Sequence, residues 1–421
     1  MSGTVAADSA QRRPRLLVLA STYPRWHGDP EPGFVHELSQ RLVADFDVRV
    51  LCPHAAGALP RECMDGVDVI RYRYAPARWE RLVNDGGIVG NLRHRPWTAL
   101  LLPSFLLGQL WSLLRMLCTA RPDVIHAHWI LPQGLMVALL QMVGIRTPPT
   151  LVTSHGADLF SLRGRFPMWI KRLTVRRMQA SSVVSSAMLG PMLALGADPD
   201  SLAVASMGVD LQHRFTPDTQ MQRAGHELLF VGRLVEKKGL THLLDALPLV
   251  LQRHPQAKLS IAGFGPELAH CQQQVERLGL QEHVRFLGAL SQDALPNLYR
   301  RSSMLITPFV QARSGDQEGL GLVMVEALGC GCPVVTTRLP AIRELRDGQW
   351  PPYLAEPGDA CSLAAQINAL LDDPAAGQTW VQQLRPSLMR RFDHAAVAAG
   401  YSARLAALAG AERTPQKSGH P

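Results

Sequence analysis

The sequence predicts an α/β protein with two domains, each built around a mainly parallel β-sheet, and three observations support this expectation. The chain has 421 residues, more than twice the ~150 residues of an average domain. Short apolar runs alternate with amphipathic stretches along nearly the whole chain, as they do in successive βα units. A polar stretch interrupts this alternation once, at about residues 210–226.

Six apolar runs in the first half are expected to be strands, with amphipathic helices between them. The expected strands are Arg15–Ala20, Val48–Cys52, Val67–Tyr72, Val124–Ala127, Leu151–Ser154 and Ser182–Ser185, and the helices include Phe34–Ala44 and Leu131–Met142. Strands joined through helices run parallel, so their carboxyl ends meet at one edge of the sheet.

The second half repeats this alternation. The expected strands are Glu227–Val231, Lys258–Ala262, Val284–Leu287, Met304–Ile306 and Pro333–Thr336. The expected helices are Leu240–His254, Pro266–Leu278, Leu320–Leu328 and Ala360–Leu371, followed by Thr379–Arg391 and Ala395–Leu408. Two sheets of comparable size predict two Rossmann-like domains, with a ligand cleft at the carboxyl ends of their strands.

The domain boundaries follow from this pattern. We expect a disordered N-terminus at 1–14, a first domain at 15–210, a linker at 211–226, a second domain at 227–385, a C-terminal helix at 386–410 and a disordered tail at 411–421. Hydrophobic residues make up 47% of the chain and charged residues 19%, which excludes long disorder within the domains.

The positive charge is concentrated in the first domain. Residues 1–215 hold 23 lysines and arginines against 16 acidic residues, and this net charge of +7 is nearly all of the chain's +8. A basic half could serve nucleic acid, an anionic membrane surface or a phosphorylated substrate, and the charge alone does not choose among them. No nucleic-acid partner is expected, because aromatic residues are 6% of the chain and no recognition motif is present.

The cysteines and the N-terminal segment indicate a cytoplasmic protein. The seven cysteines are scattered, with no C-x-x-C pair, which is typical of reduced thiols. Residues 12–20 place arginines before a strand and lack the order of a signal peptide.

One segment, Trp97–Leu117, approaches the ~20 residues that a membrane-spanning helix requires. Pro103, Gln109 and Arg115 interrupt it. It is therefore expected to be a helix of the folded domain, either buried or facing lipid headgroups, with a true membrane span as the alternative. Its basic neighbours are compatible with a peripheral position at the inner face of the cytoplasmic membrane, or with a solvated basic surface.

The most informative stretch is Asp316–Glu326. Glu318 precedes a Gly319-Leu320-Gly321 turn and a helix, whose unpaired N–H groups and dipole favour a bound phosphate. Glu326 lies roughly 8 Å further along the helix axis, so two carboxylates bracket the phosphate position. This arrangement suits a sugar diphosphate nucleoside, with Glu318 toward the sugar and Glu326 toward ribose hydroxyls.

Two cations follow the first strand of the second domain. Gly232 and Arg233 follow this strand, and Lys238 precedes Gly239 at the start of a helix. Side chains at these positions could neutralise a pyrophosphate. The alternative, two solvated surface charges, is disfavoured by their place at the carboxyl end of a strand.

In these motifs the chain resembles the retaining GT-B glycosyltransferases of glycosyltransferase family 4, from about Arg15 to Leu408. The resemblance implies a nucleotide-sugar donor held mainly by the second domain and a glycan or lipid-linked acceptor held mainly by the first. It also implies retention at the anomeric carbon, neither a metal nor another cofactor, and final helices that cross back to the first domain.

Further residues match the family. The turn with Gly263 and Gly265 is similar to one that lets the backbone approach the nucleotide, and Val284–Leu290, with Arg285 and Leu287, is similar to a segment that contacts the base. His155-Gly156-Ala157-Asp158 resembles the family's His-Gly-x-Asp turn, which implies that His155 faces the donor sugar.

The resemblance also marks the acceptor side and one departure. His128 and Trp129 are implied to be acceptor-side residues, together with Asp158. His126 and His128 share a strand face, but a zinc site would need further ligands. Many members of the family carry two glycines after the first strand, whereas this chain has the single Gly33 before Phe-Val, which is expected to take their place.

The implied reaction is departure of a nucleoside diphosphate from an anomeric carbon, in the synthesis of a cell-surface polysaccharide or glycolipid. Arg233, Lys238 and the amides at Gly319–Gly321 would stabilise the leaving group. Front-face attack and a covalent intermediate on Glu318 both remain open. A nucleotide-sugar 2-epimerase and a non-catalytic membrane-associated scaffold are the alternative functions.

Overall fold

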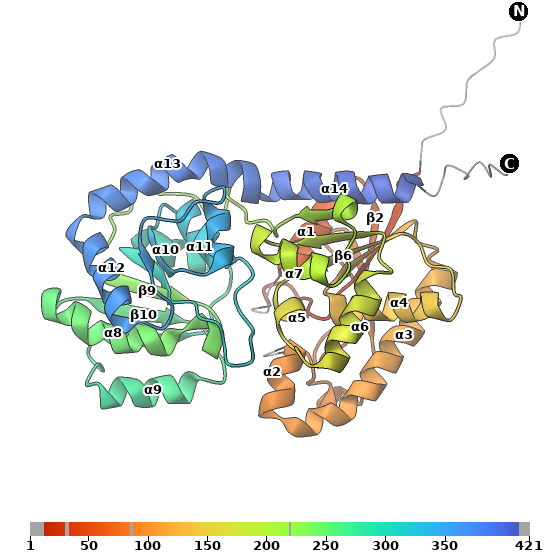
Figure 1. The fold of residues 1–421 in the computed structure, drawn as a ribbon, viewed down its shortest axis with the longest axis horizontal. Helices are drawn as coiled ribbons and strands as arrows, with labels where there is room; N and C mark the ends of the chain where they lie inside the picture. Colours follow the sequence, from red (N-terminus) through yellow and green to blue (C-terminus); the bar gives the residue numbers. More distant parts are fainter. Residues whose placement is uncertain (1–11, 30–32, 85–86, 219, 412–421) are drawn as a thin grey trace, which may run out of the picture.

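The computed structural model describes residues 12–29, 33–84, 87–218 and 220–411, and it contains two sheets that lie side by side along the molecule (Figure 1). The disorder expected for 1–14 and 411–421 falls mostly outside these residues. The eight-stranded sheet has the order β3-β4-β2-β1-β5-β6-β7-β8, and the six-stranded sheet has the order β11-β10-β9-β12-β13-β14. Each pair of neighbouring strands is parallel except β3 and β4.

The first sheet contains all six expected strands and two short edge strands that were not expected. Its strands are β1 (Arg15–Leu19), β2 (Asp47–Pro53), β3 (Arg61–Met64), β4 (Val67–Tyr72), β5 (Val124–His128), β6 (Thr150–Ser154), β7 (Ala180–Val183) and β8 (Leu202–Val204). The unexpected β3 and β8 have four and three residues, too few for a periodic pattern.

Helices cover both faces of this sheet because its central strands are buried on both sides. Leu16 and Val18 of β1 pack with α1 (Phe34–Leu42) and α14 (His394–Ala411). Leu17 and Leu19 point to the opposite face and pack with α3 (Leu102–Thr119) and α4 (Leu135–Met142). The other helices of this domain are η1 (Ala77–Trp79), α2 (Gly87–His94), η2 (Pro96–Leu101), η3 (Ile130–Gly134), α5 (Ala157–Phe160), α6 (Arg165–Val175), η4 (Ser186–Met188), α7 (Leu189–Ala194) and η5 (Pro199–Ser201).

The second sheet follows the predicted strands and adds a two-residue edge strand. Its strands are β9 (Glu227–Val231), β10 (Lys258–Ala262), β11 (Val284–Gly288), β12 (Met304–Thr307), β13 (Val334–Thr337) and β14 (Leu354–Ala355). Its helices are η6 (Glu236–Lys238), α8 (Leu240–Arg253), α9 (Leu268–Arg277), α10 (Leu295–Arg301), α11 (Leu322–Gly329), η7 (Pro340–Leu345) and α12 (Ala360–Asp372). Helices α8 and α12 cover one face of the sheet, and α11 covers the other.

The chain then returns to the first domain. Helix α13 (Pro374–Phe392) packs on α11 and α12 of the second domain, and α14 packs on α1 and β5 of the first. Figure 1 shows α13 and α14 running in succession along one side of both domains. The break between them lies at Asp393, whose backbone is extended.

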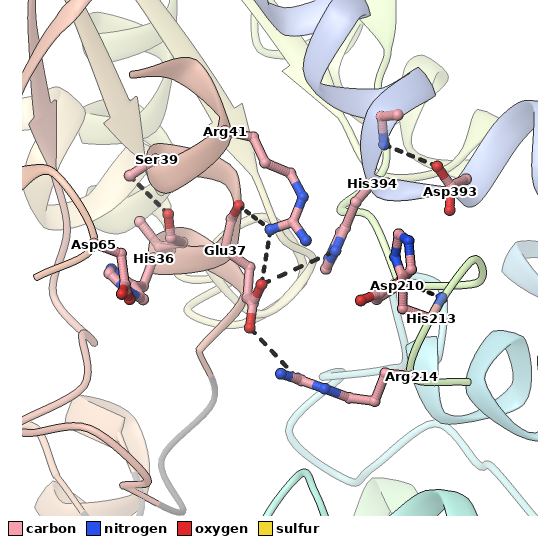
Figure 2. A network of polar contacts seen from close by, with 12 residues as sticks. His36, Glu37, Ser39, Arg41, Asp65, Asp210, His213, Arg214, Asp393 and His394 are labelled. Atoms are coloured by element: carbon pink, nitrogen blue, oxygen red, sulfur yellow. Dashed lines mark hydrogen bonds and ion pairs between the residues drawn. The ribbon is translucent and has the colours of Figure 1, made fainter. Parts of the chain in front are cut away.

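Polar contacts fix the place where the linker and the returning helix meet (Figure 2). Glu37 of α1 forms ion pairs with Arg41, at 2.8 Å, and with Arg214 of the linker, at 3.5 Å. Nδ1 of His394 lies 4.0 Å from the same carboxylate, and burial lowers the pKa of His394 to about 4. The carboxylate of Asp393 accepts a hydrogen bond from the backbone N–H of Leu211. Both connections between the domains are therefore held at the N-terminal half of α1.

Candidate active site between the two domains

The carboxyl ends of the second sheet gather the predicted acidic and basic groups. Strand β9 ends at Val231, and the chain continues through Gly232 and Arg233 into η6, which carries Lys238. The side chain of Lys238 lies over the ring of Phe309, with Nζ 4.7 Å from the ring centroid. Its aliphatic part passes beside Gly232, because a Cβ added there would be 3.7 Å from Cε of Lys238.

Lys238 forms an ion pair with Glu318. Its Nζ lies 2.8 Å from Oε2 of Glu318, and both side chains are 14% exposed. Burial by itself raises the pKa of the Glu318 carboxyl, but the charges of Lys238 and Lys237 and the N–H of Gly319 outweigh it and lower the pKa to about 2. Glu318 is therefore ionised at neutral pH and paired with Lys238.

Glu326 has the opposite electrostatic character. It lies on α11 with its side chain buried, and the hydroxyl of Tyr299 donates a hydrogen bond of 2.8 Å to its Oε2. Burial raises the pKa of this carboxyl to about 7, although the hydrogen bond and the charges of Lys238 and Arg214 act against the rise. Two carboxylates near one lysine are thus held in different protonation equilibria.

The turn before α11 presents backbone amides to the same region. Gly321 precedes the helix with a φ of 81°, and no side chain caps the helix start. The first-turn N–H groups of a helix have no intrahelical partner, so the start of α11 is suited to an anion. Gly319 and Leu320 are buried immediately before it.

The Gly263 and Gly265 turn fits closely against the Arg233 segment. A Cβ on Gly263 would lie 1.9 Å from the carbonyl oxygen of Gly232, and one on Gly265 would lie 2.4 Å from that of Leu234. Glycine is required at both positions because any larger residue would collide with backbone. The turn therefore holds the loops after β10 and β9 together at the carboxyl edge of the second sheet.

His155 lies in the first domain, directly after β6, and interacts with His128 at the end of β5. Nε2 of His155 is 3.0 Å from Nδ1 of His128, and the two rings are stacked with an interplanar angle of 12°. Burial lowers the pKa of His155 to about 3 and that of His128 well below its ordinary value. The pair is neutral at physiological pH and shares one proton in a hydrogen bond.

Asp158 fixes the loop around this pair. Its carboxylate accepts hydrogen bonds from the hydroxyl of Ser154, at 2.9 Å, and from the backbone N–H groups of His155, at 3.1 Å, and Ile130, at 2.7 Å. Burial nevertheless raises the pKa of Asp158. Since these donors lie at or just after the ends of two strands, Asp158 is a positioning residue for the turn that contains His155 and for the segment after Trp129.

Trp129 has an unusual backbone conformation and aromatic neighbours. Its φ is 81°, which costs about 1–3 kcal/mol for a residue other than glycine. Its ring centroid lies 5.0 Å from that of His155 and 6.1 Å from that of Phe34. Phe34 also lies 5.0 Å from His155, so an aromatic cluster borders the histidine pair.

The loops of the two domains touch. A Cβ on Gly156 would lie 3.2 Å from Cα of Gly319, and Nη2 of Arg163 donates a hydrogen bond of 3.1 Å to the carbonyl of Gly315. A Cβ added to Gly90 of α2 would lie 3.7 Å from Nη2 of Arg233. The His155 turn therefore faces the Glu318 turn directly.

Three predicted residues are placed less closely. Arg285 is the second residue of edge strand β11, paired with Ser260, and its side chain is exposed. Leu287, two residues further along the strand, is half-buried. Gly33 precedes α1, where an added Cβ would have room, 3.9 Å from the nearest atom of Pro24. The structure does not bring these residues into the group formed by Lys238 and Glu318.

Several site residues could not be predicted from the sequence. Tyr299 comes 27 positions before its partner Glu326, and neither its spacing nor its surroundings mark it. The same holds for Phe309, and for the buried Lys171 of α6, which donates to the carbonyl of Leu159 at 2.9 Å. These three residues are identified as site residues only by their contacts in the folded chain, which join segments distant in sequence.

Comparison with known proteins identifies the family. Residues 218–385 match the family described as glycosyl transferases group 1, and residues 34–208 match the glycosyl transferase 4-like domain.

Two curated relatives and one solved structure illustrate the similarity. The chain is 31% identical to a phosphatidyl-myo-inositol mannosyltransferase of Mycobacterium leprae over 66% of this chain and 71% of that protein. It is 29% identical to a glycogen synthase of Mycobacterium tuberculosis over 70% and 71%. The Anabaena HepE protein in complex with UDP-glucose superposes with a TM-score of 0.70 at 18% identity, over 94% of this chain and 100% of that one. The chain therefore belongs to the group 1 glycosyl transferases and has the GT-B fold.

Proposed function

We propose that the protein transfers a sugar, with retention at the anomeric carbon, from a nucleotide-sugar donor to a hydroxyl of a glycan or a lipid-linked acceptor. The observation that carries this proposal is the Lys238–Glu318 ion pair of 2.8 Å beside the N-terminus of α11. It puts an ammonium group and a carboxylate beside the backbone amides of a helix start, which are groups that can bind a sugar diphosphate.

The donor is proposed to change the partner of Lys238. Lys238 and Glu318 form an ion pair in the structure. A pyrophosphate beside Arg233 would attract the ammonium group, and Glu318 would then be free to accept hydrogen bonds from sugar hydroxyls. Glu326, which shares its site with Tyr299, would face the ribose. The amides at Gly319–Gly321 would complete the phosphate contacts.

The chemical step is proposed to depend on stabilisation of the leaving group. Negative charge develops on the departing phosphate oxygen, and Arg233, Lys238 and the α11 amides would stabilise it in a region from which water is largely excluded. These cations supply the charge that a divalent metal supplies in other transferases, so we propose metal-independent transfer. Attack on the same face, with the departing phosphate taking the acceptor's proton, agrees with retention.

The first domain is proposed to hold the acceptor. His155 would donate a hydrogen bond to the transferred sugar, because its neutral ring opposes the Glu318 turn. His128 and Trp129 would border the acceptor hydroxyl, and Asp158 would hold both turns in register. The names of two relatives, a glycogen synthase and a phosphatidyl-myo-inositol mannosyltransferase, refer to a glycan and to a lipid. These are the two classes of acceptor to be tested with this protein. The location proposed for this reaction is the cytoplasm, at the inner face of the membrane.

Transfer from radiolabelled donors tests the proposal. UDP-, GDP- and ADP-sugars would first be screened for an increase in melting temperature, since a ligand that binds the native state stabilises it. The donor that binds would then be incubated with glycan and lipid-linked acceptors, with and without a chelator, and the anomeric configuration of the product determined by NMR.

The expected result is a product with the donor's anomeric configuration, formed equally with chelator, and at least 100-fold less of it from Glu318→Ala and Lys238→Ala. An inverted product would contradict retention, and a loss of activity with chelator would contradict metal independence. If no donor binds and none is consumed, the transferase proposal is wrong. Release of an epimerised sugar without acceptor would favour the 2-epimerase alternative.

A further inference from the structure

Helix α3 and the segment before it carry apolar residues on the side that faces away from the protein. Pro96–Thr119 is long and apolar enough to cross a membrane by composition, yet only 28% of its most apolar part is buried. Phe105, Leu113 and Met116 form the buried stripe. The opposite stripe contains Leu107, 66% exposed, and Trp111, 71% exposed. An ordinary surface helix has polar residues on this side.

A second helix on the same face of the sheet repeats the pattern. On α6, Phe166 and Trp169 are 69% and 55% exposed, and their rings stack on each other at 6.1 Å with an interplanar angle of 20°. Helix α4 packs between α3 and α6, and its exposed end carries Val143. Figure 1 shows these three helices on the side of the first domain away from α14. We call the outer surface of α3, α4 and α6 the basic apolar face.

The charge of this part of the chain has one sign. Residues 86–197 contain eleven lysines and arginines and only two acidic residues, Asp123 and Asp158, a net charge of +9. Asp123 is paired with Arg12 and Arg15, and Asp158 accepts hydrogen bonds within the site. Arg115 and Arg172 are exposed beside the exposed apolar side chains of α3 and α6. Nothing acidic on these helices offsets them.

We propose that the basic apolar face docks on the surface of an anionic lipid bilayer, with Trp111, Leu107, Phe166 and Trp169 entering the headgroup region and arginines contacting lipid phosphates. Amphipathic surfaces with tryptophan, leucine and arginine bind in this way, by buried apolar area together with attraction to anionic lipid. A second copy of the chain would bring two faces of like charge together, which opposes dimerisation through this surface.

The basic apolar face is continuous with the proposed acceptor side. Helix α4 follows directly from the Ile130–Gly134 segment, which is held by Asp158. On α6 the buried Lys171 donates to the carbonyls of Leu159 and Ser161, which belong to the turn after His155. Docking would therefore place the acceptor side next to the leaflet. Membrane docking itself does not depend on the proposed function. Only its role, which is to bring a lipid-linked acceptor to the site, rests on that proposal.

Vesicle binding of the full chain, without nucleotide sugar, tests the proposal. The chain would be sedimented with vesicles of phosphatidylcholine and with vesicles that also contain phosphatidylglycerol, and bound protein would be washed with alkaline carbonate. We expect binding to the anionic vesicles, weakened by salt, and release by carbonate. Retention after carbonate would show that the helix inserts across the bilayer, and it would overturn surface docking.

Three variants locate the contact. Leu107→Glu with Trp111→Glu, and Phe166→Ser with Trp169→Ser, should each reduce the vesicle partition coefficient at least tenfold, since they remove anchors that enter the headgroup region. Arg115→Gln with Arg172→Gln should reduce it about 25-fold on anionic vesicles, at about fivefold for each arginine. The matched control is Leu193→Glu on α7, 41% exposed, which should bind like the unmodified chain.

The substituted side chains are exposed, so unchanged melting temperatures and circular dichroism would confirm that each variant is folded. Equal binding to neutral and anionic vesicles, binding that no variant alters, or a dimer broken by Leu107→Glu in light scattering would each overturn the proposal. Failure of the transferase proposal would look different: vesicle binding would persist while no nucleotide sugar changes the melting temperature.

Discussion

Replacing each of the two site carboxylates with its amide should change stability in opposite directions at pH 8. The Glu318 carboxyl has a pKa of about 2 in the folded chain against 4.5 in an unperturbed one, and at about 1.4 kcal/mol for each pH unit its ionisation contributes about 3 kcal/mol. Glu318→Gln should therefore lower the free energy of unfolding by about this amount. The Lys238 ion pair is the contact that the amide cannot replace.

Glu326→Gln should do the reverse. The folded pKa of about 7 lies above 4.5, so the buried carboxyl costs about 3 kcal/mol once it is forced to ionise at high pH. The amide avoids that cost and its oxygen can still accept the hydrogen bond from Tyr299. Its unpartnered N–H groups reduce the expected gain to about 1–2 kcal/mol.

The pH dependence distinguishes the two carboxylates. A depressed folded pKa gives stability that is complete above pH 4.5 and lost as the pH falls toward 2, so the penalty of Glu318→Gln should shrink in acid. A raised folded pKa gives stability that is complete below pH 4.5 and lost as the pH rises through 7, so the advantage of Glu326→Gln should grow as the pH rises from 4.5 through 7 and persist at pH 8.

Urea denaturation at several pH values between 3 and 8 would measure both variants against the unmodified chain, with the change in midpoint at constant slope taken as the change in stability. The reasoning would be refuted if both variants changed stability in the same direction at pH 8. It would also be refuted if either difference were independent of pH, because then the effect would not come from ionisation.

Three further predictions concern the site and its supports. Lys238→Gln should lower kcat at least 100-fold in the transfer assay, whereas Lys258→Gln, an exposed lysine at the start of β10, should leave it unchanged. Gly156→Ala should lower kcat/KM at least tenfold, because the added Cβ meets Gly319 at 3.2 Å, whereas Gly279→Ala, also at positive φ but with open space around it, should only cost about 1 kcal/mol of stability. Lys171→Met should lower the free energy of unfolding by about 2–3 kcal/mol in urea titrations, because two buried carbonyls lose their donor; an unchanged midpoint would contradict its positioning role.

Much of the fold could be predicted because its strands are buried on both faces. β9 and β10 begin and end where the apolar runs do, since parallel strands between helices are continuously apolar. The short edge strands β3, β8 and β14 could not be predicted, because two to four residues carry no period and form only where a neighbour offers hydrogen bonds. The segment Trp97–Leu117 is helical and is divided between η2 and α3. Its buried side chains are mostly apolar, as in an ordinary core helix, but its exposed side is also mostly apolar.

The site could be predicted in part. The spacing of Glu318 and Glu326 with respect to the α11 turn, and the place of Lys238 after β9, follow from local sequence and the direction of parallel strands. The direct pairing of Lys238 with Glu318, and the partner of Glu326, depend on contacts over 27 to 80 residues that no local pattern encodes. Arg285 shows that a match in local sequence does not by itself place a residue in the site. It lies in a segment that matches the family, but its side chain is exposed on an edge strand.

The central claim is that separate acidic and basic groups of the second domain bind one activated sugar opposite His155. Titration calorimetry with UDP-, GDP- and ADP-sugars tests it most directly, using the unmodified chain, Lys238→Gln and Glu318→Gln. The account predicts that one donor binds with a 1:1 stoichiometry and that each variant weakens its binding at least tenfold. Binding of no donor, or a donor affinity that neither variant changes, would contradict it.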